Sequence, residues 1–201
     1  MNNPKAESMA RYAAAVTMAD SLRAVSGGVE PKVLVVLGSG LEGVVGETRI
    51  VATIDFADVP GFPAPTVQGH AGRFVFGYVG ETPALIMQGR IHLYEGHPVE
   101  LLAVYVRAAK LLGCETFVVT NAAGGVNPAY DPGDIVLIED HINLMLTNPL
   151  MGPNVDEFGP RFPAMVDAYT PALRDLARQV AAELDVDIRE GVYAGLRGPT
   201  F

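Results

Sequence analysis

Alternating stretches of two hydrophobic patterns predict that helices and strands follow one another along this chain. Residues 7–25 carry apolar side chains at roughly a 3.6-residue period and stop before two glycines, which predicts a helix. Residues 33–37 are a continuous run of Val and Leu, typical of a strand buried on both faces. A second helix is predicted for residues 98–113 and a further buried strand for residues 117–120.

The remaining segments extend the same alternating pattern. Four more strands or strand regions and one more helix are predicted, at residues 48–59, 73–88, 134–140 and 188–196 for the strands and 170–184 for the helix. Residues 60–65 predict a rigid proline-rich loop, and residues 141–165 a long functional or interfacial connection. No internal repeat or second core is evident. We therefore expect one α/β domain over residues 1–201, with a central mixed β-sheet flanked by helices.

Composition narrows the function classes. The 201 residues include 49% hydrophobic side chains, which suits a globular domain. A net charge of -9 argues against binding nucleic acid, which needs a basic face. The polar N-terminus does not suit a signal peptide, and no apolar run reaches the roughly 18 residues of a membrane span. The single cysteine, Cys114, fits a reducing cytoplasm and predicts a buried structural thiol.

A glycine-rich loop after the strand at 33–37 is the first candidate site. Residues 38–43 read GSGLEG, and such glycines let backbone N–H groups converge on a phosphate while Ser39 adds a hydroxyl. The spacing also fits a dinucleotide-binding loop, with Asp55 or Asp58 as its acidic partner, or a plain strand-to-helix turn. Serine-hydrolase chemistry fits less well, because the glycines do not flank Ser39 at the required distance.

A second candidate follows the apolar strand that ends near residue 88. Residues 89–97 read GRIHLYEGH, and in an extended chain Arg90, His92 and Tyr94 share one face. Arg90 can grip an oxyanion with two parallel N–H bonds, and His92 can donate a third. A solvated charged loop is the alternative. A metal site is not predicted, because His92 and His97 lack the usual zinc spacing and have no cysteine nearby.

Two further segments carry small residues beside polar ones. Residues 120–125, TNAAGG, follow a predicted strand and would let a ligand approach the backbone closely. His70 lies between glycines on a loop, in the sequence GHAG at 69–72, which suggests a mobile gate.

Taken together, these segments resemble the trimeric purine nucleoside phosphorylases. The matching stretches occur in family order over nearly the whole chain: VLGSGL at 36–41, GHAG at 69–72, GRIHLYEG at 89–96, TNAAGG at 120–125, DHINL at 140–144, RFPAM at 161–165 and GPTF at 198–201. The resemblance implies phosphorolysis of inosine- or guanosine-class nucleosides to a free purine and (deoxy)ribose 1-phosphate in purine salvage. It implies a cytoplasmic homotrimer that needs no metal or organic cofactor.

The same resemblance implies residue roles. It assigns phosphate binding to Ser39, Arg90, His92 and the backbone of Ala122, with His70 as a gating histidine; His92 and His70 are the expected catalytic residues. Contacts to the nucleoside are assigned to Tyr94, Asn121, Ala123, Phe162 and Phe201, with Phe162 entering the neighbouring subunit's sugar pocket.

The family pattern continues beyond Phe201, so we expect a fold that is incomplete at its C-terminus and doubtful activity for the 201 residues alone. The alternatives are a methylthioadenosine phosphorylase, a truncated relative that binds phosphate without catalysis, and a dinucleotide oxidoreductase. The last leaves residues 89–97 and 120–125 unexplained.

Overall fold

A computed structural model of the chain describes residues 3–64 and 71–199. The described chain divides into two compact units. The first comprises Met1–Ala122 with Asn148–Gly159, and the second comprises Ala123–Thr147 with Pro160–Phe201. The expectation of one domain over residues 1–201 stays a prediction, whereas the mixed α/β class is confirmed.

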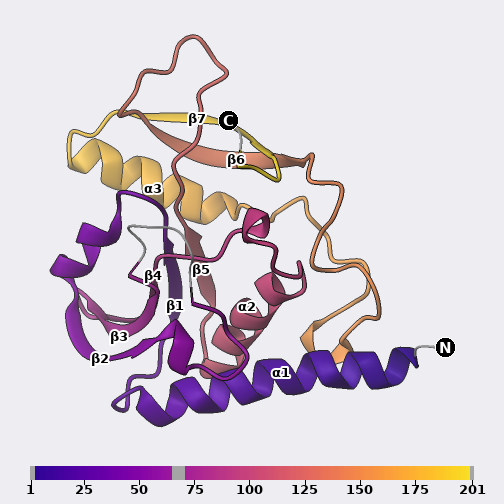
Figure 1. The fold of residues 1–201 in the computed structure, drawn as a ribbon. Helices are drawn as coiled ribbons and strands as arrows, with labels where there is room; N and C mark the ends of the chain where they lie inside the picture. The colour runs from indigo at the N-terminus through magenta and orange to yellow at the C-terminus, as the bar shows by residue number, and fades with distance from the viewer. Residues whose placement is uncertain (1–2, 65–70, 200–201) are drawn as a thin grey trace. The chain divides into compact units, whose positions relative to one another are not determined.

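A five-stranded mixed sheet forms the centre of the first unit (Figure 1). Its strands lie in the order β2 (Arg49–Asp55), β3 (Arg73–Val79), β4 (Thr82–Gln88), β1 (Val33–Leu37) and β5 (Thr116–Val119). β1 pairs in parallel with β4 on one side and with β5 on the other, while β3 is antiparallel to both β2 and β4. Three parallel strands therefore end at the same edge of the sheet.

The strand predicted for residues 73–88 is two strands, so that prediction was wrong in its detail. β3 and β4 form an antiparallel hairpin in which Val79 is in register with Thr82. Gly80 lies in the turn with φ at +59°, a conformation that glycine adopts without strain. Continuous apolar residues on both sides of this short turn concealed the reversal of the chain.

Helices α1 (Pro4–Val25) and α2 (Leu101–Leu112) pack against each other beside this sheet (Figure 1). Asn3 caps α1, since its side-chain oxygen accepts from the backbone N–H groups of Lys5 at 3.1 Å and Ala6 at 3.4 Å. Gly113, with φ at +109°, ends α2 in the left-handed conformation usual at a helix C-terminus. Both helices confirm the predicted ones to within a turn.

Alternate side chains of the strands enter different hydrophobic clusters. Leu34 and Val36 of β1 join the larger cluster with α1 and α2, whereas Leu37 joins the smaller one with Val45. Three phenylalanines form the aromatic part of the larger cluster, with ring centroids 4.6 to 5.5 Å apart: Phe56, Phe62 and Phe74. This two-sided burial is what the Val and Leu run at 33–37 predicts.

β5 is not the buried strand that its sequence predicts. Phe117, Val118 and Val119 have exposed fractions of 46%, 42% and 43%. Within the described part of the chain β5 has only β1 as a hydrogen-bonded neighbour, so it forms an edge of the sheet. A β-branched and aromatic run therefore gave the strand correctly but not its burial.

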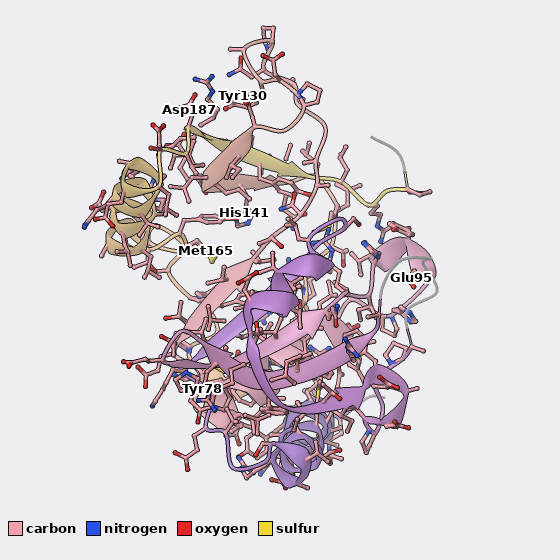
Figure 2. The ribbon with its side chains drawn as sticks, turned by 90° about the vertical axis from the view of Figure 1, so that its left-hand side faces the viewer. Tyr78, Glu95, Tyr130, His141, Met165 and Asp187 are labelled. Carbon is pink, nitrogen blue, oxygen red and sulfur yellow. The ribbon has the colours of Figure 1, made fainter. Side chains whose placement is uncertain are left out.

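The second unit contains a parallel pair of strands and a helix. β6 (Ile135–Asn143) pairs with β7 (Ile188–Gly195), and α3 (Pro171–Glu183) connects to β7. Arg178 of α3 donates two hydrogen bonds to the Glu190 carboxylate, at 2.5 and 2.8 Å. Figure 2 labels Tyr130 near this strand pair, where its hydroxyl donates to the Glu190 carbonyl at 2.7 Å. Thr170 precedes α3 but its side chain makes no capping bond.

Most of the long connection predicted for residues 141–165 is irregular, although its first three residues complete β6. Its portion at Asn148–Gly159 belongs to the first unit. Ser8 of α1 donates to the Asn154 carbonyl at 2.6 Å, and Arg11 donates to the Met151 carbonyl at 2.8 Å. Side-chain hydrogen bonds from α1 therefore hold this part of the connection against the helix.

Within residues 3–64 and 71–199, no helix has both the length and the apolar composition needed to cross a membrane.

Candidate functional site

Three loops meet at the edge of the sheet where β4, β1 and β5 end. The register places Leu37 at the end of β1 beside Gln88 at the end of β4, and Val36 beside Val119 at the end of β5. The residues after these strands are therefore neighbours, although they are separated by up to about 80 positions in sequence. Loops at the carboxyl ends of parallel strands are where open α/β sheets bind ligands.

The loop after β1 presents backbone donors and the Ser39 hydroxyl. Gly38 is buried, whereas Ser39 and Gly40 are exposed. Gly40 has φ at +81°, and the Leu41 N–H closes the turn by donating to the Gly38 carbonyl at 3.2 Å. The hydrogen bonds among the described residues include none from the N–H of Ser39 or Gly40. These donors are available to an anion.

The loop after β5 lies directly against this turn. The Gly38 N–H donates to the Thr120 hydroxyl at 2.9 Å. A Cβ atom on Gly38 would lie 2.6 Å from the Thr120 carbonyl oxygen and 2.7 Å from the Asn121 Cα atom. Glycine is therefore needed at position 38 because the two backbones approach so closely. The Gly38 backbone therefore lies directly against Thr120 and Asn121.

The turn after β4 orients His92 through Glu95. One carboxylate oxygen of Glu95 accepts from the His92 backbone N–H at 2.6 Å and lies 3.1 Å from His92 Nδ1. The Glu95 side chain is only 1% exposed, and Figure 2 shows it on the turn that follows β4. Because Nδ1 faces Glu95, a bond from this ring to a bound anion must come from Nε2. Tyr94 stacks on the imidazole, with ring centroids 4.7 Å apart.

Arg90 brings a positive charge to the same turn. Its residue is half-buried and follows Gly89, which has φ at +93°. Burial raises the pKa of Tyr105 on α2, and the nearby positive charge of Arg90 acts in the opposite direction. The Arg90 guanidinium therefore lies near enough to Tyr105 of α2 for its charge to act on that hydroxyl.

The structure brings six of the predicted site residues to the loops of the first unit: Ser39, Arg90, His92, Tyr94, Asn121 and Ala122. Ala123 and Phe162 belong to the second unit, and Phe162 is 87% exposed. His70 and Phe201 lie outside the described residues.

Sequence reasoning gave no role to Glu95 or Thr120, although both lie inside the motifs. The spacing of three between His92 and Glu95 is the signal that could have revealed their contact, since it matches a capping box. Nothing in the sequence pattern alone indicates that the Thr120 hydroxyl reaches across to Gly38.

Two other sequence predictions concern sulfur and metals. Cys114 is buried as predicted, and burial raises the pKa of its thiol to about 11, which makes it a poor nucleophile at neutral pH. Across the part of the chain that the structure describes, no group of three or more His, Cys, Asp or Glu side chains is arranged to hold a metal ion.

Comparisons with known proteins identify the family of this chain. Residues 32–201 match the family model described as the phosphorylase superfamily. The chain is 47% identical over 178 residues to the purine nucleoside phosphorylase of Anopheles gambiae, covering 86% of this chain and 50% of that protein. It is 48% identical over 176 residues to the Bos taurus purine nucleoside phosphorylase, covering 85% and 61%.

A solved structure gives the same result at the level of the fold. Isoform 2 of the Schistosoma mansoni purine nucleoside phosphorylase, in complex with cytosine and ribose-1-phosphate, superposes with a TM-score of 0.87 at 44% identity. The match covers 94% of this chain and 68% of that one. The chain spans about half to three-fifths of the length of the curated relatives it matches. It belongs to the phosphorylase superfamily, among the relatives of the purine nucleoside phosphorylases.

Proposed function

We propose that this protein catalyses the phosphorolysis of purine nucleosides of the inosine and guanosine class, yielding a free purine and (deoxy)ribose 1-phosphate. The observation that carries the proposal is the meeting of three donor-bearing loops at one sheet edge, after β1, β4 and β5. The kinship with purine nucleoside phosphorylases and the ribose-1-phosphate bound to the Schistosoma mansoni relative support the same reaction.

Phosphate fits these loops because they offer many donors within a small space. The Ser39 hydroxyl and the N–H groups of the β1 loop supply neutral donors. Arg90 supplies a charged guanidinium that can donate two parallel hydrogen bonds. His92 adds a further donor from Nε2 when its ring is protonated. Fixed donors of this kind hold the attacking group in place and lower the entropic barrier by several kcal/mol, on the order of 7–11 at best.

In the reaction an oxygen of hydrogen phosphate forms a bond to C1′ of the nucleoside, and the C1′–N9 bond breaks. The electron pair of that bond goes to the purine, and the proton of hydrogen phosphate ends on the released base. The sugar gains positive charge at the transition state, which the bound phosphate stabilises. His92 and His70 are the proposed catalytic residues, and Tyr94, Asn121, Ala123, Phe162 and Phe201 the proposed nucleoside contacts.

The proposal extends to the assembly and its surroundings. We place the protein in purine salvage in the cytoplasm, without a metal or organic cofactor, and as a homotrimer. The high exposure of the Phe162 side chain, at 87%, fits a residue that packs against a neighbouring subunit. The lone cysteine fits a reducing compartment.

Release of base in phosphate buffer tests the proposed reaction. Inosine or guanosine should yield free purine with phosphate present and none in phosphate-free buffer, and chelation of metals should not change the rate. Methylthioadenosine, offered in competition, should be the poorer substrate; if it is the better one, the protein is a methylthioadenosine phosphorylase. Phosphate-independent release would contradict phosphorolysis.

Arg90→Ala should raise the KM for phosphate about a hundredfold and change the KM for nucleoside about twofold at most, because a charge-assisted pair contributes about 1.5–3 kcal/mol. Arg49→Ala is the matched control. Arg49 is in register with Tyr78, which is in register with Pro83 at the start of β4, so Arg49 lies at the opposite end of the sheet. Equal effects of Arg90→Ala on both KM values would count against its role in phosphate binding.

A further inference from the structure

Thr120 connects the loops after β1 and β5 through its side chain. Its hydroxyl accepts from the Gly38 N–H at 2.9 Å and donates to the Val36 carbonyl at 3.0 Å. Its backbone N–H donates to the same Val36 carbonyl at 3.0 Å. Three hydrogen bonds made by Thr120 therefore hold the end of β1 against the end of β5, on both sides of Leu37.

The backbone pairing of β1 with β5 does not by itself hold Gly38 in place. β1 and β5 are paired only as far as Val36 and Val119, and Gly38 lies beyond the paired residues. The Gly38 N–H is the first donor after the strand, and Gly38 is buried. A buried N–H without an acceptor is costly, so the Thr120 hydroxyl determines whether Gly38 can stay in this position.

The position of Gly38 in turn determines where the next donors point. Ser39 and Gly40 follow directly, and their N–H groups are the ones left without a described partner. Asn121 and Ala122 follow Thr120 in the same way on the other strand. A shift of the Gly38 backbone would therefore move the donors of both loops relative to each other.

We propose that Thr120 is a positioning residue for the phosphate site: its hydroxyl holds the donors of the β1 loop in register with the β5 loop. This inference rests on the proposed function, since it takes phosphate as the ligand of these loops. Thr120 does not itself touch the phosphate. Its effect on phosphate affinity comes from preorganisation, because a loop that is already ordered loses less entropy when it binds.

The test compares three threonine variants by calorimetric titration with inorganic phosphate and by steady-state kinetics. Thr120→Val keeps the shape of the side chain but removes the hydroxyl, and Thr120→Ser keeps the hydroxyl. Thr116→Val is the matched control, because Thr116 begins the same strand at its other end and no side-chain bond of Thr116 occurs among the described residues.

Thr120→Val should weaken phosphate binding and raise the phosphate KM by about tenfold, with the nucleoside KM within about twofold. Thr120→Ser and Thr116→Val should stay within about twofold of the parent chain in phosphate affinity. If the Thr120 hydroxyl only supports the fold, its loss should lower the fraction of active protein and should not change the phosphate KM relative to the nucleoside KM. Parent-like phosphate affinity in folded Thr120→Val overturns the inference.

Amide hydrogen exchange of the parent protein decides the matter if Thr120→Val does not fold. Without phosphate, the Gly38 amide should exchange at least about tenfold more slowly than those of Ser39 and Gly40, after correction for intrinsic rates. Added phosphate should then slow Ser39 and Gly40. Equal exchange at all three positions overturns the inference.

The two proposals fail in different ways. A parent chain that binds phosphate but releases no purine contradicts the proposed function and still allows Thr120 to be judged by phosphate affinity. A parent chain that releases purine, with Thr120→Val unchanged, contradicts only the role of Thr120. A parent chain that does not bind phosphate contradicts both.

Discussion

At the scale of single residues, Glu95 joins the local fold to the proposed chemistry. Its carboxylate is 1% exposed and receives two contacts from His92, one from the backbone N–H and one from the ring. A carboxylate buried to this degree is costly unless its bonds are made. The stacked ring of Tyr94 restricts the imidazole on another side. His92 therefore has a fixed orientation before any ligand binds.

Glu95→Ala should raise the phosphate KM about tenfold and lower the free energy of unfolding by about 1–3 kcal/mol, because His92 loses the acceptor of two contacts. Glu81→Ala is the control, since Glu81 is exposed on the turn between β3 and β4. Steady-state kinetics and thermal unfolding measure the two effects. If stability falls and the phosphate KM does not change, Glu95 supports the fold and does not orient His92 for phosphate.

At the scale of elements, the contact between the ends of β1 and β5 depends on one glycine. Gly38→Ala would put a Cβ atom 2.6 Å from the Thr120 carbonyl oxygen and 2.7 Å from the Asn121 Cα atom, and neither backbone atom can move away as a side chain could. We expect a loss of about 2–4 kcal/mol in the free energy of unfolding, together with weaker phosphate binding. Denaturant unfolding of the variant measures the loss.

Gly43→Ala provides the control for that substitution. Gly43 lies in the short helical turn after the β1 loop, has no atom within 4 Å of an added Cβ, and does not require a positive φ. Its variant should match the parent chain or be slightly more stable. Equal losses in the two variants would mean that the β1 loop is sensitive to any side chain and not to the close approach at Gly38.

The elements themselves were largely predictable from hydrophobic pattern. The run at residues 33–37 corresponds to β1 without any shift, and the helix predicted from residue 98 ends at Gly113 as expected. The hairpin within 73–88 was missed because its turn is short and its flanks are apolar. The burial of β5 was mispredicted because burial depends on neighbouring strands, which the local pattern does not contain.

For the candidate site, the positions of several residues at strand ends were predictable from the sequence, but their contacts were not. Ser39, Arg90 and Asn121 each follow a predicted strand, so their meeting at one edge follows from parallel pairing. The contacts that fix them, from Glu95 to His92 and from Thr120 to Gly38, are tertiary distances that no residue pattern encodes. The sequence thus predicts candidate ligand-binding groups, while the structure shows the hydrogen bonds that position His92 and Gly38.

At the scale of the whole molecule, the second unit has several highly exposed large apolar side chains. Leu146 is 93% exposed, Phe162 87% and Val166 93%. Exposed apolar side chains mark a site of association where they form one contiguous patch. The guanidinium of Arg161 lies 5.9 Å from the Phe162 ring centroid, a contact that leaves most of the ring exposed.

In the proposed homotrimer Phe162 enters the sugar pocket of a neighbouring subunit, so its removal should affect nucleoside binding alone. Phe162→Ala should raise the nucleoside KM about tenfold, leave the phosphate KM within about twofold, and leave the thermal midpoint of each subunit nearly unchanged. Val166→Ala is the control, because Val166 is similarly exposed and lies four residues away, and it should behave like the parent chain.

Light scattering after size exclusion should give three times the 21.3 kDa of one chain. A 21.3 kDa particle that binds nucleoside normally in both variants would contradict the trimer and the role of Phe162 together. A trimer with unchanged nucleoside KM in Phe162→Ala would contradict the role of Phe162 only, since assembly would then rest on other side chains.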